Sequence, residues 1–144
     1  FENEITKYAD IIFGVKSTYE KSGVYVNAER RLHLSQPLIT NDLPDDWQVI
    51  QGISKALGSD KLNYQNSKEI WQEVQIKAPN RFSGASYEKL EAKRTEGLQW
   101  PIGEDETKIL HTKSFRTKDG LAHLRYKKYA LRGMVNELLH KKRS

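Results

Sequence analysis

The chain has 144 residues, a net charge of +5 and no cysteine. This length suits one domain, and the lack of thiols excludes a disulfide, a thiolate metal site or an iron–sulfur cluster built from these residues. No apolar stretch approaches the roughly 20 residues that span a membrane, so no membrane span is predicted. Only 37% of the residues are hydrophobic and the chain does not open with Met, which together predict a piece of a larger polypeptide.

The positive charge is concentrated at the end of the chain. Between residues 108 and 143, eleven lysines and arginines stand against two acids, a local charge of +9. Such an end is typical of an arm for an anionic partner, or of a segment that packs against an acidic or phosphate-bearing part of its own protein. Aromatic residues are sparse and no nucleic-acid-binding motif is present, so we expect no nucleic-acid partner. A non-enzymatic basic interaction module remains an alternative.

The chain opens with a predicted strand and a polar loop. Residues 9–15 form an apolar run too short for a core helix and predict a buried strand. Residues 16–23 form a loop that carries Lys21 and ends at Gly23, which is free to adopt positive φ. Residues 24–26 resume an extended pattern. A lysine in such a loop is suited to bind an anionic ligand at the edge of an α/β sheet.

Three helices follow in the prediction. The clearest covers residues 44–57, because Pro44 suits a first helical position and the two acids after it favour the positive end of the helix dipole. Its apolar residues share one face at helical spacing: Trp47, Ile50, Ile53 and Leu57. Shorter helices are predicted over residues 66–74, opened by a capping box, and over residues 86–93.

The last third of the chain predicts a hairpin and a helix. Residues 115–126 are typical of a hairpin around the Lys118-Asp119-Gly120 turn. Residues 128–140 place an apolar stripe on one helical face. The fold class predicted for the whole chain is a partial α/β unit with several helices, a hairpin and much irregular structure.

Five motifs, in this order, resemble the molybdopterin oxidoreductase family, whose large subunits bind bis(molybdopterin guanine dinucleotide). They are KYAD at residues 7–10, EKSG at 20–23, NAERR at 27–31, PDDW at 44–47 and GLQWP at 97–101. The last motif follows SYEKL at residues 86–90, and this combination is most similar to formate dehydrogenase large (alpha) subunits. A nitrate reductase-type molybdoenzyme is the nearer alternative within the family.

The resemblance implies a place in a larger architecture. Residues 1–58 would be the C-terminal part of the molybdopterin-binding α/β domain. Residues 59–144 would be a mixed helix and hairpin segment that leads toward a β-barrel dinucleotide-binding domain, which is missing here. The parent would oxidise formate to CO2 at molybdenum and pass electrons through iron–sulfur (4Fe–4S) clusters to electron-transfer subunits. This chain alone is expected to be inactive, and its compartment stays open between cytoplasm and periplasm.

The same resemblance implies two cofactor-binding residues. Lys21 matches the lysine of the family's EKxG motif, and Asp45 matches the acid before the tryptophan-bearing helix, with Asp46 close enough in register to be confused with it. The residue types fit the cofactor, because pyrophosphate attracts cations and a carboxylate accepts the paired N–H groups of guanine. Asn27 and Arg30 could reach polar cofactor atoms or hold the loop through ion pairs with Glu20 and Glu29, and for both we expect the structural role. The four histidines have no ligand spacing, so no metal ligand and no catalytic residue are expected in this chain.

Overall fold

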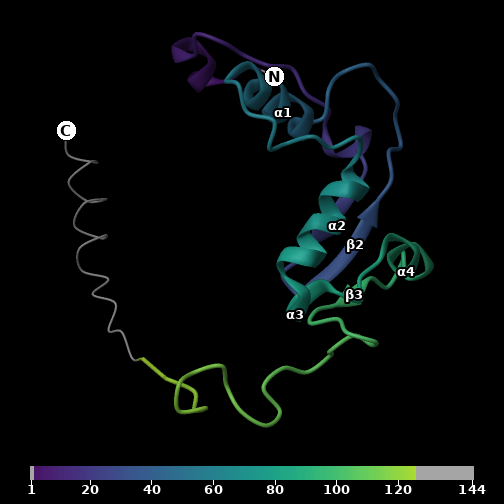
Figure 1. Ribbon diagram of the computed structural model, residues 1–144, viewed down its shortest axis with the longest axis vertical. Coiled ribbons are helices and arrows are strands. Elements are labelled where there is room, and N and C mark those ends of the chain that lie inside the picture. Colours follow the sequence, from purple (N-terminus) through teal and green to yellow (C-terminus); the bar gives the residue numbers. More distant parts are fainter. Residues whose placement is uncertain (1, 126–144) are drawn as a thin grey trace, which may run out of the picture. The chain divides into compact units, whose positions relative to one another are not determined.

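The computed structural model describes residues 2–125 (Figure 1). The chain divides into two compact units, the first ending at Lys108 and the second beginning at Ile109, and each is described by itself. The helix predicted over residues 128–140 and most of the basic end lie outside the described residues.

Within residues 2–125, the helices and strands lie in the first unit. Two 3₁₀ turns come first, Glu4–Tyr8 and Thr18–Glu20. Strands and helices then follow in the order β1 (Gly23–Val26), β2 (Arg31–Ser35), α1 (Asp46–Ala56), α2 (Ser67–Lys77), α3 (Pro79–Phe82), α4 (Tyr87–Ala92) and β3 (Leu98–Gln99). This mixture of helices with a small antiparallel sheet agrees with the predicted class, a partial α/β unit.

The sheet has the order β1-β2-β3, and both strand pairs are antiparallel. A short loop joins β1 to β2, and the Asn27 side chain organises it. Its oxygen accepts hydrogen bonds from the backbone N–H groups of Glu29 (2.9 Å) and Arg31 (3.0 Å), as asparagine does in turns. Arg30 lies between them in the left-handed region, with φ of 63°. Asn27 thus has a structural role, as predicted, but it acts through hydrogen bonds to the backbone and not through ion pairs.

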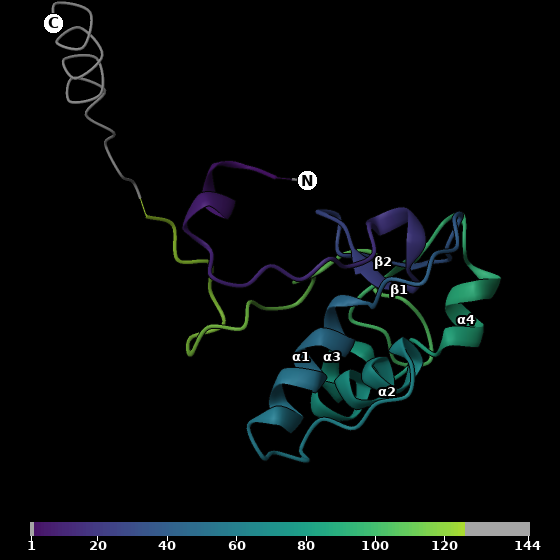
Figure 2. The same ribbon diagram turned by 90° about the horizontal axis from the view of Figure 1, so that it is seen from above.

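The core lies on one face of β2. Leu32 and Leu34 are 0% and 5% exposed and alternate with half-buried neighbours, as the two-residue period of a strand requires. Leu32 pairs with Leu98 of β3, and Trp71 of α2 and Leu90 of α4 also belong to this cluster. Ala85 and Ile102 complete it. Figure 2 shows α1, α2 and α3 gathered on one side of the sheet.

The predicted strand over residues 9–15 is wrong. This run is irregular, and Ile11, Ile12 and Phe13 are all exposed. In the part of the chain that the structure describes, the sheet begins at β1. Among the described residues the run therefore pairs with no strand, and hydrophobic residues alone do not make a strand without a neighbouring one.

The three predicted helices are confirmed, with shifted ends. α1 begins at Asp46, one residue after its N-cap Asp45, and α2 and α4 lie where helices were predicted. The apolar face of α1 is nevertheless largely open. Trp47 is half-buried, whereas Ile50, Ile53 and Leu57 are exposed.

The second unit contains a turn where a hairpin was predicted. The Phe115 N–H donates to the Gly120 carbonyl (2.9 Å), and the Gly120 N–H donates to the Thr117 carbonyl (3.1 Å). No strand forms within residues 109–125. The turn is therefore confirmed and the strands are not, because the exposed Leu121 and Leu124 have no apolar face to bury against in the described part of this unit.

Candidate functional site

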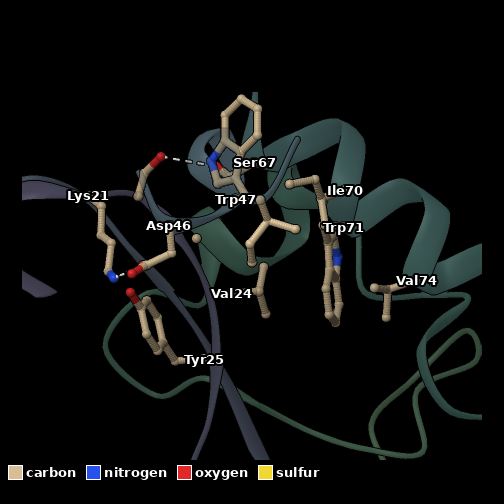
Figure 3. A pocket seen from close by; sticks show the side chains of 12 residues that line it. Lys21, Val24, Tyr25, Asp46, Trp47, Ser67, Ile70, Trp71 and Val74 are labelled. Atoms are coloured by element: carbon tan, nitrogen blue, oxygen red, sulfur yellow. Dashed lines mark hydrogen bonds and ion pairs between the residues drawn. The ribbon is translucent and has the colours of Figure 1, made fainter. Parts of the chain in front are cut away.

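A cavity of about 480 Å³ lies between β1, the beginning of α1 and one face of α2. Figure 3 shows its walls and its polar edge. The walls are apolar or aromatic: Val24, Trp47, Ile50, Ile70, Trp71 and Val74. The polar side chains belong to Lys21, Ser22, Tyr25, Asp46 and Ser67. A mostly apolar cavity with a few polar groups is the usual form of a small-molecule site.

Hydroxyl groups tie the cavity to the helices around it. The Ser22 and Ser67 hydroxyl oxygens lie 3.2 Å apart, and the Ser67 oxygen lies 3.2 Å from the Tyr87 hydroxyl. This chain of contacts joins the loop before β1 to the start of α2 and then to α4. The loop that carries Lys21 is therefore held against the folded core.

Lys21 is fixed at the edge of the cavity by an ion pair. Its ammonium group donates a hydrogen bond to the Asp46 carboxylate (Figure 3), and only 20% of the lysine side chain is exposed. The hydrogen bond to Asp46 raises the pKa of Lys21 above its usual value, and burial opposes that increase. Lys21 is therefore a cation at neutral pH, as binding of a phosphate requires.

Asp45 lies next to this pair but makes different contacts. It is the N-cap of α1, where its backbone N–H donates to the Gln48 side-chain oxygen (2.8 Å). Its carboxylate oxygen Oδ1 is buried without a hydrogen-bond partner among the described residues. The Lys16 ammonium lies 3.9 Å from that oxygen. A buried acceptor without a hydrogen-bond donor is unusual in a folded protein.

The structure brings Lys21 and Asp45 to the same corner of the fold but does not join them. Lys21 and Asp46 line the cavity, whereas Asp45 does not. Sequence reasoning therefore missed Asp46 as the partner of Lys21, and it also missed Tyr25. The two consecutive acids could have indicated this partner. Asp45 caps the helix and Asp46 begins it, so their side chains have different neighbours.

Arg30 has a structural role, as expected, but through backbone carbonyls and not through the expected ion pairs with Glu20 and Glu29. Its guanidinium group donates to the carbonyls of Trp100, Thr107 (3.3 Å) and Lys108 (3.1 Å). It also lies 5.8 Å from the centroid of the Trp100 ring. A planar group with five donors is suited to hold several carbonyls at once. Arg30 thus secures the irregular segment after β3 rather than facing the cavity.

The described residues offer no metal site, since no three acidic or histidine side chains gather within residues 2–125. Three of the four histidines, His33, His111 and His123, belong to that part of the chain. None of the helices in this part is long and apolar enough to cross a membrane.

Comparison with known proteins gives a consistent result. No family model matches the chain. The F420-dependent formate dehydrogenase subunit alpha of Methanocaldococcus jannaschii is 31% identical over 126 residues, which is 83% of this chain and 18% of that protein. The F420-dependent formate dehydrogenase 2 subunit alpha of Methanococcus maripaludis is 32% identical over 127 residues, with shares of 84% and 18%.

A bacterial relative extends the comparison. A Staphylococcus aureus protein named as a formate dehydrogenase is 36% identical over 123 residues, or 81% of this chain and 12% of its own length. The chain is similar to part of these formate dehydrogenase alpha subunits. The chain spans only 12 to 18% of the length of these curated relatives. The boundary predicted at residue 58 concerns the longer polypeptide and stays a prediction.

Proposed function

We propose that this chain is part of the catalytic subunit of a molybdenum-dependent formate dehydrogenase. The three relatives described above are all named as formate dehydrogenases, which supports this proposal over a nitrate reductase. The parent protein would convert formate to CO2, one proton and two electrons. When bound, the molybdenum cofactor would supply that two-electron chemistry, and electron-transfer subunits would accept the electrons.

Within that parent, this segment would hold one guanine dinucleotide arm of the bis(molybdopterin guanine dinucleotide). The observation that carries the assignment is the half-buried Lys21 ammonium at the edge of an apolar cavity. A fixed cation in a partly desolvated site attracts pyrophosphate oxygens strongly. Lys21 would therefore bind the phosphate part of the arm.

Asp45 would recognise the base of the same arm. Guanine presents two adjacent N–H donors, and an ionised carboxylate accepts both. The Asp45 carboxylate lies at the same corner of the fold as Lys21, and its Oδ1 has the Lys16 ammonium 3.9 Å away but no hydrogen-bond donor among the described residues. The chain itself has no cysteine, so thiolate ligands for iron–sulfur clusters would come from other parts of the parent protein.

Cofactor loading of the parent tests this proposal. In a formate dehydrogenase alpha subunit that carries this segment, Lys21→Ala and Asp45→Asn should each lower bound molybdenum and releasable guanine nucleotide several-fold. Lys61→Ala removes an exposed lysine between α1 and α2 and should leave the molybdenum and guanine nucleotide contents unchanged. Cofactor content and formate turnover at control levels in both site variants would contradict the proposal.

A further inference from the structure

Two lysines of one loop face two consecutive acids at the start of α1. The Lys16 ammonium lies 3.9 Å from Asp45, and the Lys21 ammonium bonds to Asp46. The Lys16 N–H also donates to the Pro44 carbonyl at 3.0 Å. The loop is therefore held to the beginning of the helix at both of its ends.

The two partners in the second pair differ in how firmly they are placed. The Lys21 side chain is 20% exposed and the Asp46 side chain is 55% exposed. A carboxylate that is more than half exposed returns to water at little cost, because it regains its hydration. Lys21 can therefore stay in place while Asp46 leaves it.

We propose that Asp46 is a positioning residue that occupies the place of a phosphate on Lys21 until an entering phosphate displaces it. The inference rests on the proposed function, because it takes Lys21 as the lysine that binds the cofactor phosphates. Its ligand class is the diphosphate group of a guanine nucleotide. Asp46 then has two effects: it holds the ammonium group at the edge of the cavity, and it competes with the ligand.

Competition follows from charge. A phosphate that bonds to Lys21 approaches to within a few ångströms of the Asp46 carboxylate, and like charges at that separation repel. The Lys21 ammonium attracts both the phosphate and the Asp46 carboxylate, but these two anions repel each other when they lie on the same side of it. Removing the charge of Asp46 should therefore strengthen phosphate binding. A residue with only a structural role would have the opposite effect, since its loss would free Lys21 and weaken binding.

The test measures the affinity of the 144-residue chain for GDP and for inorganic pyrophosphate by calorimetry. Asp46→Asn should tighten the dissociation constant by about tenfold, and Asp46→Glu should restore the wild-type value. Asp42→Asn removes an equal charge from an exposed position before α1 and should change affinity less than twofold. Circular dichroism establishes that each variant retains its helices.

Three outcomes are distinct. Tighter binding in Asp46→Asn alone supports the inference. Wild-type binding that Lys21→Ala abolishes, together with equal or weaker binding in Asp46→Asn, overturns the inference and leaves the proposed function standing. Absence of binding in every variant overturns both, since Lys21 would then not be a phosphate-binding residue.

Discussion

The indole N–H of Trp71 donates a 2.6 Å hydrogen bond to the backbone carbonyl of Ala85. Trp71 comes from α2 and Ala85 from the segment between α3 and α4, so this bond joins two separate parts of the core. Both residues are buried, with 8% and 0% of their surface exposed. A buried carbonyl that loses its donor costs about 1–3 kcal/mol.

The variant Trp71→Phe should therefore destabilise the fold by more than the loss of buried apolar surface alone would, because it also loses this hydrogen bond. We expect a loss of about 2 kcal/mol or more in the free energy of unfolding. Trp47→Phe is the matched control, because the Trp47 indole N–H has no partner among the described residues. Urea unfolding measures both variants. Equal losses in the two would show that the bond to Ala85 contributes nothing.

We expect the change from glycine to alanine to have opposite effects on stability at Gly97 and at Gly52. At Gly97 φ is +67°, and a Cβ atom would lie 2.6 Å from the Leu32 carbonyl oxygen. Gly52 lies within α1, and a Cβ atom there would meet nothing within 4 Å. Gly97→Ala should destabilise the fold by more than about 1 kcal/mol, whereas Gly52→Ala should stabilise it by up to about 1 kcal/mol.

Thermal unfolding of the two glycine variants checks this contrast. We expect the midpoint to fall for Gly97→Ala and to rise for Gly52→Ala. A fall in both would mean that α1 needs flexibility at Gly52. A rise in both would contradict the left-handed conformation at Gly97.

The ion pair between Lys68 and Glu88 predicts a pH effect. The hydrogen bond from Lys68 at 2.7 Å, with further bonds from the start of α4, lowers the pKa of Glu88 from 4.5 to about 2. A lowered pKa adds stability above the unfolded value, and that stability is lost as the pH falls from about 4.5 toward 2. Both side chains are exposed, so the contribution should be small and should weaken with salt.

Carboxyl NMR titration measures this pKa directly. In Lys68→Ala the pKa of Glu88 should rise toward 4.5, whereas in the control Lys61→Ala it should stay near 2. Identical titration curves in the two variants would show that Lys68 does not stabilise the carboxylate.

Arg30 predicts a local rather than a global effect. Its guanidinium group holds the carbonyls of Trp100, Thr107 and Lys108, so Arg30→Ala should release the segment after β3. The backbone N–H of Thr107, which bonds to Gln99 at 3.1 Å, should exchange with solvent faster. Hydrogen exchange checks this, with protection of Leu32 and Leu34 as the control. Arg30→Lys should not restore protection, because one ammonium group lacks the planar fork of donors.

The sequence predicted the parts of the fold that depend on local signals. Pro44 and the two acids after it marked the start of α1. Asn66 marked the start of α2, where its side-chain oxygen accepts a hydrogen bond from the Glu69 backbone N–H at 3.0 Å. These signals act within one helical turn, so they are legible without the rest of the structure.

The elements that were predicted wrongly or not at all depend on contacts with residues distant in the sequence. The run at residues 9–15 has the composition of a strand, but a strand exists only beside another strand. β2 was missed because its burial is decided by Leu98, Leu90 and Trp71, which follow it by dozens of residues. At the site, the loop and the EKxG motif predicted Lys21 as a site residue but did not predict its ion-pair partner, because the choice between Asp45 and Asp46 depends on which of them caps the helix.

The most direct test of phosphate binding at this cavity is an NMR titration of the isotope-labelled 144-residue chain with GDP. We expect saturable shifts at Lys21, Tyr25 and the Trp47 indole N–H, which all belong to residues that line the cavity. These shifts should be lost in Lys21→Ala and kept in Lys61→Ala. Shifts confined to the basic residues beyond residue 108, or equal shifts in both variants, would contradict binding at this cavity.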